Sequence, residues 1–209
     1  MPEYDIHVNQ YSRKFVTCAC NFIMIIMSRK YKFHNPEGLY FITFATVGWI
    51  DVFSRQIYRD LLIENLQYCQ KEKGLELFAW CIMSNHVHLI ARAKENYLMQ
   101  DILRDYKKFT SKLILKTIEE NPQESRKEWM LKYFNEAGIA NSNNQKYQFW
   151  QQDNHPIELW SNAVIDQKIE YVHCNPVVAG IVEKPEEYIY SSARDYCGTG
   201  GLLDVTLLY

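Results

Sequence analysis

Two histidines stand two residues apart in an apolar segment of the chain, as His86 and His88. Side chains alternate between the two faces of a strand, so both imidazoles would point to one side while Val87 and Leu89 point into a core. Two imidazoles on one face are suitable ligands for a divalent metal ion. Because this spacing is also common where strand histidines are merely half-exposed, a metal site requires further ligands elsewhere in the chain.

A second set of chemically capable side chains lies near residue 170. Tyr171 and Asn175 are four residues apart, which places them on one face of a helix and turns His173 away. The Asn175 amide could supply a third, oxygen ligand, and the Tyr171 phenol could act as a nucleophile. The spacing alone favours a structural role for both, because tyrosines are frequent in cores and asparagine before proline commonly ends a helix.

Four segments rich in β-branched and aromatic residues predict the strands that would position these groups. They span residues 39–47, 75–83, 86–93 and 148–151. A tight turn at residues 84–85 joins the second strand to the third, which carries the two histidines.

Three helices are predicted from apolar spacing and from start and stop signals. The first has Ser54 as its N-cap and runs to about residue 73, and the second covers about 97–118. The third is capped by Asn162 or Ser161 and ends at Pro176. The apolar residues at helical spacing are Ile57, Leu61, Leu62, Leu66 and Cys69 in the first helix; in the second, Leu98, Ile102, Leu103, Phe109, Leu113 and Ile114 are expected to face inward.

The predicted order of elements is β-α-β-β-α-β, the order of an α+β ferredoxin-like fold in which an antiparallel sheet carries its helices on one face. An additional C-terminal helix, the one with Tyr171, follows. A chain of 209 residues, 47% of them hydrophobic, suits one such domain. We expect it to span residues 27–209, with an N-terminal extension over 1–26 and an insertion at about 119–147 that contains a short helix.

The chemically capable segments together resemble a known family, the single-tyrosine HUH transposases (transposase IS200-like), and within it the REP-associated tyrosine transposase branch. Four motifs carry the resemblance, and they occur in the family's order. They are MSNHVHLI at 83–90, FWQQ at 149–152, YVHCNPVVAG at 171–180 and YIYSSARDY at 188–196, which contains the Ser-Ser-x-Arg element of that branch.

The resemblance implies a metal-dependent DNA strand-transferase. His86 and His88 would hold Mg²⁺ or Mn²⁺, with Asn175 as the third protein ligand. Tyr171 would attack a phosphodiester of single-stranded DNA, leaving a 5′-phosphotyrosine link and a free 3′-hydroxyl. The expected targets are hairpin-flanked, REP-like sites. Two alternatives remain open: a domesticated protein that binds DNA hairpins without cleaving them, and a metal-dependent nuclease that uses water.

A basic stripe on the second predicted helix is the candidate DNA-binding surface. Cations four residues apart on a helix share one side, where they could contact a DNA backbone or simply face solvent. Tyr106 lies among them and is a rival nucleophile, but it lacks an amide partner four residues later. The predicted DNA-binding residues are Arg104, Lys107, Lys108, Lys112 and Lys116.

Composition restricts partners and compartment. The net charge of −2 argues against a protein that coats DNA non-specifically. Six scattered cysteines indicate free thiols, and the apolar run at 16–27 is too short to span a bilayer, so we expect a cytoplasmic protein without a membrane partner. The oligomeric state is monomer or homodimer, and the lack of a coiled coil favours a monomer. Five tryptophans offer stacking surfaces for unpaired bases: Trp49, Trp80, Trp129, Trp150 and Trp160.

Overall fold

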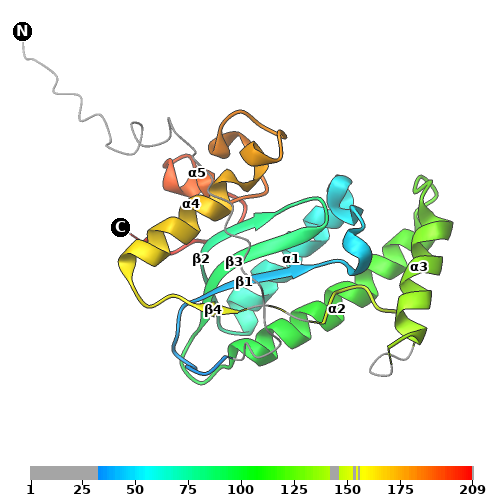
Figure 1. Cartoon of the computed structure of the whole chain (residues 1–209), viewed down its shortest axis with the longest axis horizontal. Helices are drawn as coiled ribbons and strands as arrows, with labels where there is room; N and C mark the ends of the chain where they lie inside the picture. The colour runs from blue at the N-terminus through cyan, green and yellow to red at the C-terminus, as the bar shows by residue number, and fades with distance from the viewer. Residues whose placement is uncertain (1–32, 142–145, 153, 155, 209) are drawn as a thin grey trace, which may run out of the picture.

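A computed structural model describes residues 33–141, 146–152, 154 and 156–208 of the chain. The predicted extension over residues 1–26 lies outside the described residues. Figure 1 shows a sheet with helices packed on both of its faces. Among the described residues, no helix is long and apolar enough to cross a membrane.

The sheet has four antiparallel strands in the order β2-β3-β1-β4. This is the strand order of a ferredoxin-like fold, so the predicted architecture is confirmed. The strands are β1 (Tyr40–Ala45), β2 (Leu75–Ile82), β3 (His86–Ala93) and β4 (Ile157–Glu158).

The helices divide between the two faces of the sheet. Phe44 of β1 packs edge-on against Tyr106 of α2, whereas Phe41 packs against Tyr171 of α4. Residues 41 and 44 lie on opposite sides of an alternating strand, so α1 and α2 cover one face and α4 the other. The helices are α1 (Gln56–Glu72), α2 (Met99–Glu120), α3 (Lys127–Ile139), α4 (Asn162–Val178) and α5 (Ala193–Tyr196), with short 3₁₀ turns η2 (Val47–Trp49), η3 (Val52–Ser54) and η4 (Pro185–Glu187).

The start of α1 differs from the prediction. Ser54 is not its N-cap: it ends the turn η3, and its hydroxyl donates to the Asp51 carbonyl at 2.7 Å. The cap position belongs to Arg55, whose side chain makes no capping bond. Within α1, Ile57 is exposed and the neighbouring Tyr58 is buried in its place.

Two residues of α2 that were predicted to face inward are exposed instead. Leu98 precedes the helix, and Phe109 is 60% exposed. The buried stripe runs through Tyr106 and Thr110. Thr110 can be buried because its hydroxyl donates to the Tyr106 carbonyl at 2.7 Å and accepts from the Trp150 indole at 3.1 Å.

The fourth strand was predicted in the wrong place. Only Trp150 of segment 148–151 makes a β-bridge, to Thr46, and the strand proper is β4, seven residues later. Between these two pairings, the Nζ atom of Lys107 donates to the Gln151 carbonyl and to the Asn154 side chain, each at 2.7 Å. This segment therefore follows the β1 edge while being tied to α2.

The segment that was predicted as an insertion packs against the rest of the sheet domain, and the short helix predicted within it is present as α3. Glu124, just before α3, is buried and forms ion pairs with Arg55 at 2.7 Å and with Arg126 at 3.0 Å. Burial raises the pKa of Glu124, but its hydrogen bonds with Arg126 outweigh that effect and lower the pKa to about 2. Arg126 also donates to the carbonyl of Asp51 at 3.2 Å, which holds the loop between β1 and α1.

Of the two predicted caps of α4, Ser161 is the cap and Asn162 is the first residue of the helix. The Ser161 hydroxyl accepts a hydrogen bond from the backbone of Val164. The helix does not stop at Pro176 but continues to Val178. The proline removes only its own backbone donor, and the later amides find partners: Ala179 donates to the Asn175 carbonyl at 2.9 Å. Because the helix continues past Pro176 to Val178, Asn175 lies inside it.

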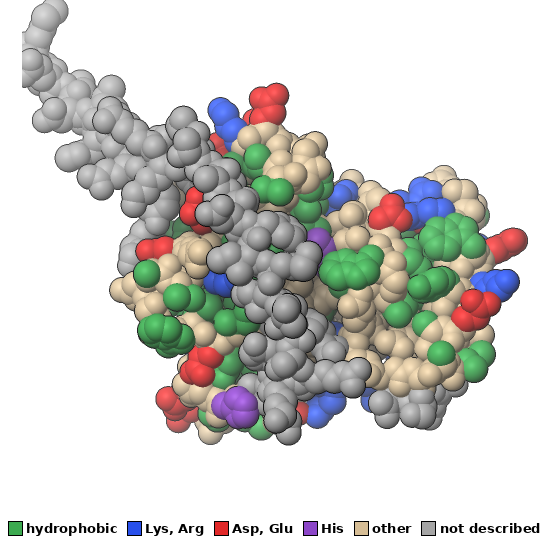
Figure 2. Space-filling model, viewed as in Figure 1, with side chains coloured by type: hydrophobic (Ala, Val, Ile, Leu, Met, Phe, Trp, Pro, Cys, Tyr) green, Lys and Arg blue, Asp and Glu red, His purple; other side chains and the backbone are tan. Residues whose placement is uncertain are grey.

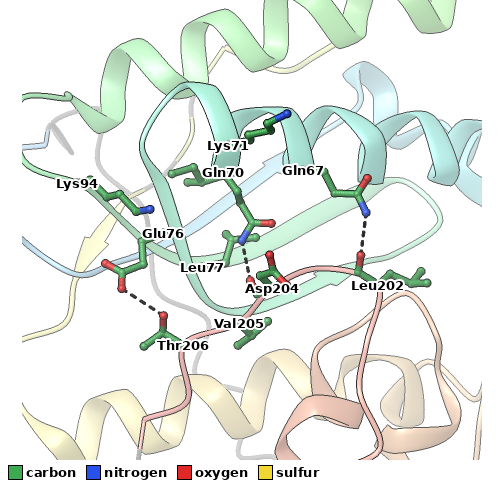
Figure 3. Close-up of a pocket in the computed structure, with 11 residues that line it drawn as sticks. Gln67, Gln70, Lys71, Glu76, Leu77, Lys94, Leu202, Asp204, Val205 and Thr206 are labelled. Carbon is green, nitrogen blue, oxygen red and sulfur yellow. Dashed lines mark hydrogen bonds between the residues drawn. The ribbon is translucent and has the colours of Figure 1, made fainter.

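The C-terminal part of the chain covers the free edge of β2. Ile82 donates to the Tyr190 carbonyl at 2.9 Å, and further along β2 Thr206 donates to the Leu77 carbonyl at 2.9 Å. Figure 3 shows the last segment held to α1 by Gln67 and Gln70, which donate to the carbonyls of Leu202 and Asp204. The cleft of about 550 Å³ beneath it contains none of the predicted site residues. Unpaired strand edges invite pairing with other chains, and this cover prevents it on the β2 side.

Candidate active site

The two histidines of β3 face α4, as their spacing predicts. Their ring centroids lie 4.7 Å apart. The Nδ1 atom of His86 lies 2.6 Å from the Asn85 side-chain oxygen, and the Nδ1 atom of His88 lies 2.8 Å from the Thr43 hydroxyl. Each imidazole is thus oriented through its Nδ1 atom, which leaves the Nε2 atoms for other partners.

The His88 ring is almost completely buried, and its Nε2 atom has no hydrogen-bond partner among the described residues. Burial lowers the pKa of His88 well below its ordinary value, and the neighbouring His86 lowers it further, whereas the Asn175 side chain raises it. Burial also lowers the pKa of His86 to about 4. Both rings are therefore neutral at physiological pH and retain the lone pairs that a metal ion requires.

Tyr171 lies directly beside this pair. Its ring packs edge-on against His88 with centroids 5.4 Å apart, and against Phe41 at 5.8 Å. The side chain remains 43% exposed, so a substrate can reach it. Asn175, one turn later, donates to the Tyr171 carbonyl at 2.7 Å. The structure therefore brings together His86, His88, Tyr171 and Asn175 on the α4 side of the sheet.

Tyr106, the rival nucleophile, lies on the other side. It is buried between α1 and α2, where its hydroxyl donates to the Leu62 carbonyl at 3.4 Å. Burial raises the pKa of the Tyr106 phenol well above its ordinary value. This tyrosine is 3% exposed and packs against Phe44, on the opposite side of the sheet from the histidine pair.

His173 is turned away from the pair, as predicted, and ties α4 to the edge of β2. Its Nε2 atom lies 2.8 Å from the Ser192 hydroxyl, which also accepts from the Trp80 backbone at 2.8 Å. Burial lowers the pKa of His173 to about 3, so the ring is neutral. The Ser-Ser-x-Arg element thus positions the helix that carries Tyr171.

A Ser192→Ala protein should be measurably less stable. The substitution leaves the Trp80 amide and the His173 ring without a partner in the core, at about 1–3 kcal/mol of unfolding free energy for each. For a domain of this size, Tm falls by roughly 2–4 °C per kcal/mol, which circular dichroism can follow. Thr199→Ala removes an exposed hydroxyl from the same region and serves as control. Equal Tm values for the two variants would contradict this role of Ser192.

The basic stripe borders a groove of about 730 Å³ between α2 and segment 146–152. Lys107 is occupied in holding that segment, and Arg104 pairs with Asp101 at 2.6 Å. Lys116 lies 3.7 Å from Glu120 on the exposed surface, where ion pairs contribute little. The groove does not share a face with the histidine pair. Its cationic residues are Arg104, Lys107, Lys108, Lys112, Lys116 and Lys146.

Three further side chains take part in the site and were not predicted. Thr43 and Asn85 orient the two histidines, and Lys168 lies over the rings of Phe41 and Tyr171 at 4.7 and 5.4 Å. Lys168 precedes Tyr171 by three residues, so helical spacing could have indicated it. Among the described residues, no three His, Cys, Asp or Glu side chains gather as a metal site. A site here depends on Asn175.

The chain is similar to known proteins. A family described as "Transposase IS200 like" matches residues 40–153, more than half of the chain. The chain belongs to the IS200-like transposase family. The matched region of this IS200-like chain contains both histidines and ends before α4, so it covers one part of the site and leaves Tyr171 and Asn175 outside.

Two further comparisons agree with IS200-like membership. The chain is 27% identical over 176 residues to a Haemophilus influenzae protein described as "Putative REP-associated tyrosine transposase", covering 79% of this chain and 85% of that one. A solved structure of a REP-associated tyrosine transposase bound to a REP hairpin has a TM-score of 0.55 and 17% identity, covering 86% of this chain and 94% of the other. At that identity, the structural likeness shows a shared fold.

Proposed function

We propose that this protein nicks and rejoins single-stranded DNA, with Tyr171 as the nucleophile and His86, His88 and Asn175 as ligands of a divalent cation. The observation that carries the proposal is the contact of the exposed Tyr171 ring with the buried ring of His88. Strand pairing and helix packing bring these groups together from positions 83 residues apart in the sequence.

The side chains present fit a Mg²⁺ or Mn²⁺ ion. Nε2 of His88 is buried and accepts no hydrogen bond of ordinary geometry among the described residues, while the Asn175 side chain interacts with the same ring. The two groups could therefore share one metal ion. Imidazole and amide ligands leave coordination positions open for a phosphate, as a catalytic site requires. When bound, the cation would act as a Lewis acid that stabilises negative charge on the phosphate oxygens.

In the proposed reaction, the Tyr171 oxygen attacks the phosphorus of a phosphodiester. A bond forms between that oxygen and phosphorus, and the bond from phosphorus to the 3′ oxygen breaks. The phenolic proton leaves to solvent, and the departing 3′ oxygen takes up a proton as a free hydroxyl. The phosphotyrosine bond conserves the energy of the broken linkage, so a 3′-hydroxyl can later reverse the step without a nucleotide cofactor. The ammonium group of Lys168 adds positive charge beside the phosphate.

The proposed substrate is single-stranded DNA next to a hairpin. Two relatives support this choice, since one is described as REP-associated and the other was solved with a REP hairpin. The basic groove along α2 would hold the phosphate backbone of the hairpin stem. The single-stranded DNA that adjoins the hairpin stem would then pass around the β4 edge of the sheet and reach Tyr171 on the α4 side.

Incubation with labelled, hairpin-flanked single-stranded DNA and Mn²⁺ tests the proposed reaction. A labelled band at the mass of a protein–DNA adduct should appear on a denaturing gel, and EDTA should prevent it. Cleavage without an adduct would identify a nuclease that uses water, and binding without cleavage would identify a hairpin-binding protein. Either result would overturn the proposed mechanism.

Salt dependence of DNA binding tests the groove. Lys108→Ala and Lys112→Ala should each reduce the slope of log Kobs against log salt by about 0.7–0.9, the contribution of one phosphate contact. Fluorescence anisotropy with a hairpin oligonucleotide at several salt concentrations measures this slope. Lys132→Ala removes an equally exposed lysine of α3 from outside the groove and should leave the slope unchanged. A common slope for all three variants would exclude backbone binding by the groove.

A further inference from the structure

Trp49 is an exposed aromatic residue at the edge of the proposed active site. Its indole is 56% exposed and packs edge-on against the ring of His86, with centroids 5.8 Å apart. Trp80 and Trp150 are buried in the core, and Trp160 is 81% exposed before α4. Trp129, on α3, is 48% exposed. Among the described ring contacts of the five tryptophans, the contact with a proposed metal ligand is that of Trp49. Figure 2 shows this face of the molecule, with hydrophobic side chains at the surface beside a histidine.

The backbone of Trp49 is held in a strained conformation. Its φ of 55° lies in the left-handed region, which a residue with a bulky side chain rarely adopts. Gly48 before it has a φ of 65° and is packed so closely against Tyr133 of α3 that a side chain would collide with the phenol. Such strain persists only where the surroundings impose it, and it is concentrated at functional sites.

Hydrogen bonds fix this turn relative to the histidines. The Trp49 amide donates to the Thr46 carbonyl at 3.1 Å, and the Trp49 carbonyl accepts from the Asn85 side chain at 3.1 Å. The oxygen of that same side chain contacts Nδ1 of His86. Asn85 therefore couples the position of the tryptophan to that of the proposed ligand.

The loop that follows the turn is braced as well. Arg126 donates to the Asp51 carbonyl and to the Ser54 hydroxyl, each at 3.2 Å, while Arg126 itself is paired with the buried Glu124. The turn is thus a rigid support whose effect is to present a flat apolar ring to solvent beside the metal ligands. A flat ring in this position suits the face of an unpaired nucleobase, because stacking on an aromatic side chain requires no particular base.

We propose, on the basis of the nicking function proposed above, that Trp49 is a stacking platform for an unpaired base next to the phosphate that Tyr171 attacks. Bases in a duplex already stack on one another, so the platform would favour single-stranded DNA. It would also hold the strand in register with the histidine pair.

Trp49→Phe and Trp49→Gly test this role. Wild-type tryptophan fluorescence should be quenched when single-stranded DNA binds, and most of that quenching should be lost in both variants. Trp49→Gly should bind single-stranded DNA roughly tenfold more weakly, within the range expected for one lost stack, and should bind duplex DNA unchanged. Glycine adopts a positive φ without strain, so this variant should keep its Tm. Trp160→Phe, which removes a more exposed indole, should retain both quenching and affinity.

Unchanged quenching and affinity within twofold in both Trp49 variants would overturn the platform. Failure of the nicking function has a different signature. If the wild-type protein forms no adduct but its fluorescence is quenched through Trp49, the platform stands and the nicking chemistry falls. If the wild-type protein forms the adduct but the Trp49 variants bind single-stranded DNA as the wild type does, the nicking function stands and the stacking role of Trp49 falls.

Discussion

A Tyr171→Phe protein is expected to bind hairpin-flanked single-stranded DNA with wild-type affinity but to form no covalent adduct with it. The substitution removes the attacking oxygen and keeps the aromatic ring that packs against Phe41 and His88. Loss of a nucleophile typically reduces the rate by more than about a thousandfold, so cleavage should fall below detection. Denaturing gels with 5′- and 3′-labelled DNA measure the adduct and the free 3′ end separately.

Matched tyrosine variants make the test specific. Tyr106→Phe alters the rival nucleophile, whose buried hydroxyl donates to the Leu62 carbonyl, and should leave the adduct intact at a modest cost in stability. Tyr68→Phe removes an exposed phenol of α1 and should change nothing. An adduct that persists in Tyr171→Phe and disappears in Tyr106→Phe would identify Tyr106 as the nucleophile and contradict the proposed role of Tyr171.

His88→Ala should abolish the response of the protein to Mn²⁺. A ligand present at one hundred times its Kd raises the unfolding free energy by about 2.7 kcal/mol, which corresponds to roughly 5–10 °C in Tm for a domain of this size. The wild-type protein should show such a shift, and the variant should show almost none. Metal-dependent cleavage should fall at least about 100-fold, because even outer-shell substitutions cost 10- to 100-fold.

The variant also loses core packing, so the informative quantity is the change in Tm on adding Mn²⁺ to each protein. His34→Ala, which removes an exposed histidine remote in sequence from β3, is the matched control and should retain the full shift. A His88→Ala protein stabilised by Mn²⁺ as strongly as the wild type would place the metal elsewhere.

Local sequence signals predicted most of the fold. β3 begins and ends where its alternation indicates, because its two faces meet different surroundings. Ser161 was recognisable as a cap because its role depends on the three following residues. The helical spacing of Tyr171 and Asn175 could likewise be read directly, since both lie on one element.

The features that could not be predicted depend on distant partners. The fourth strand was predicted in the wrong place because the positions of Trp150 and Gln151 depend on distant partners. Trp150 pairs with the edge of β1, and Lys107 of α2 binds the Gln151 carbonyl. Phe109 looked like a core residue, but the side of α2 that faces the core carries Tyr106 and Thr110, and Phe109 lies outside that side. Trp49 could not be distinguished from the other tryptophans, because its contact with the His86 ring joins residues 37 positions apart in the chain.

The hydrogen bonds of Ser192, which hold α4 to the sheet, also set when the proposed site can be complete. Trp80 and Ser192 are 112 residues apart in the chain, so α4 cannot be secured until the Ser-Ser-x-Arg element has been synthesised. At about 5–20 residues per second, a ribosome needs roughly 6–22 s to cover that distance. During this interval the nascent chain carries both histidines without a positioned tyrosine. The proposed DNA-nicking activity would therefore be absent from any translation product that ends before Ser192.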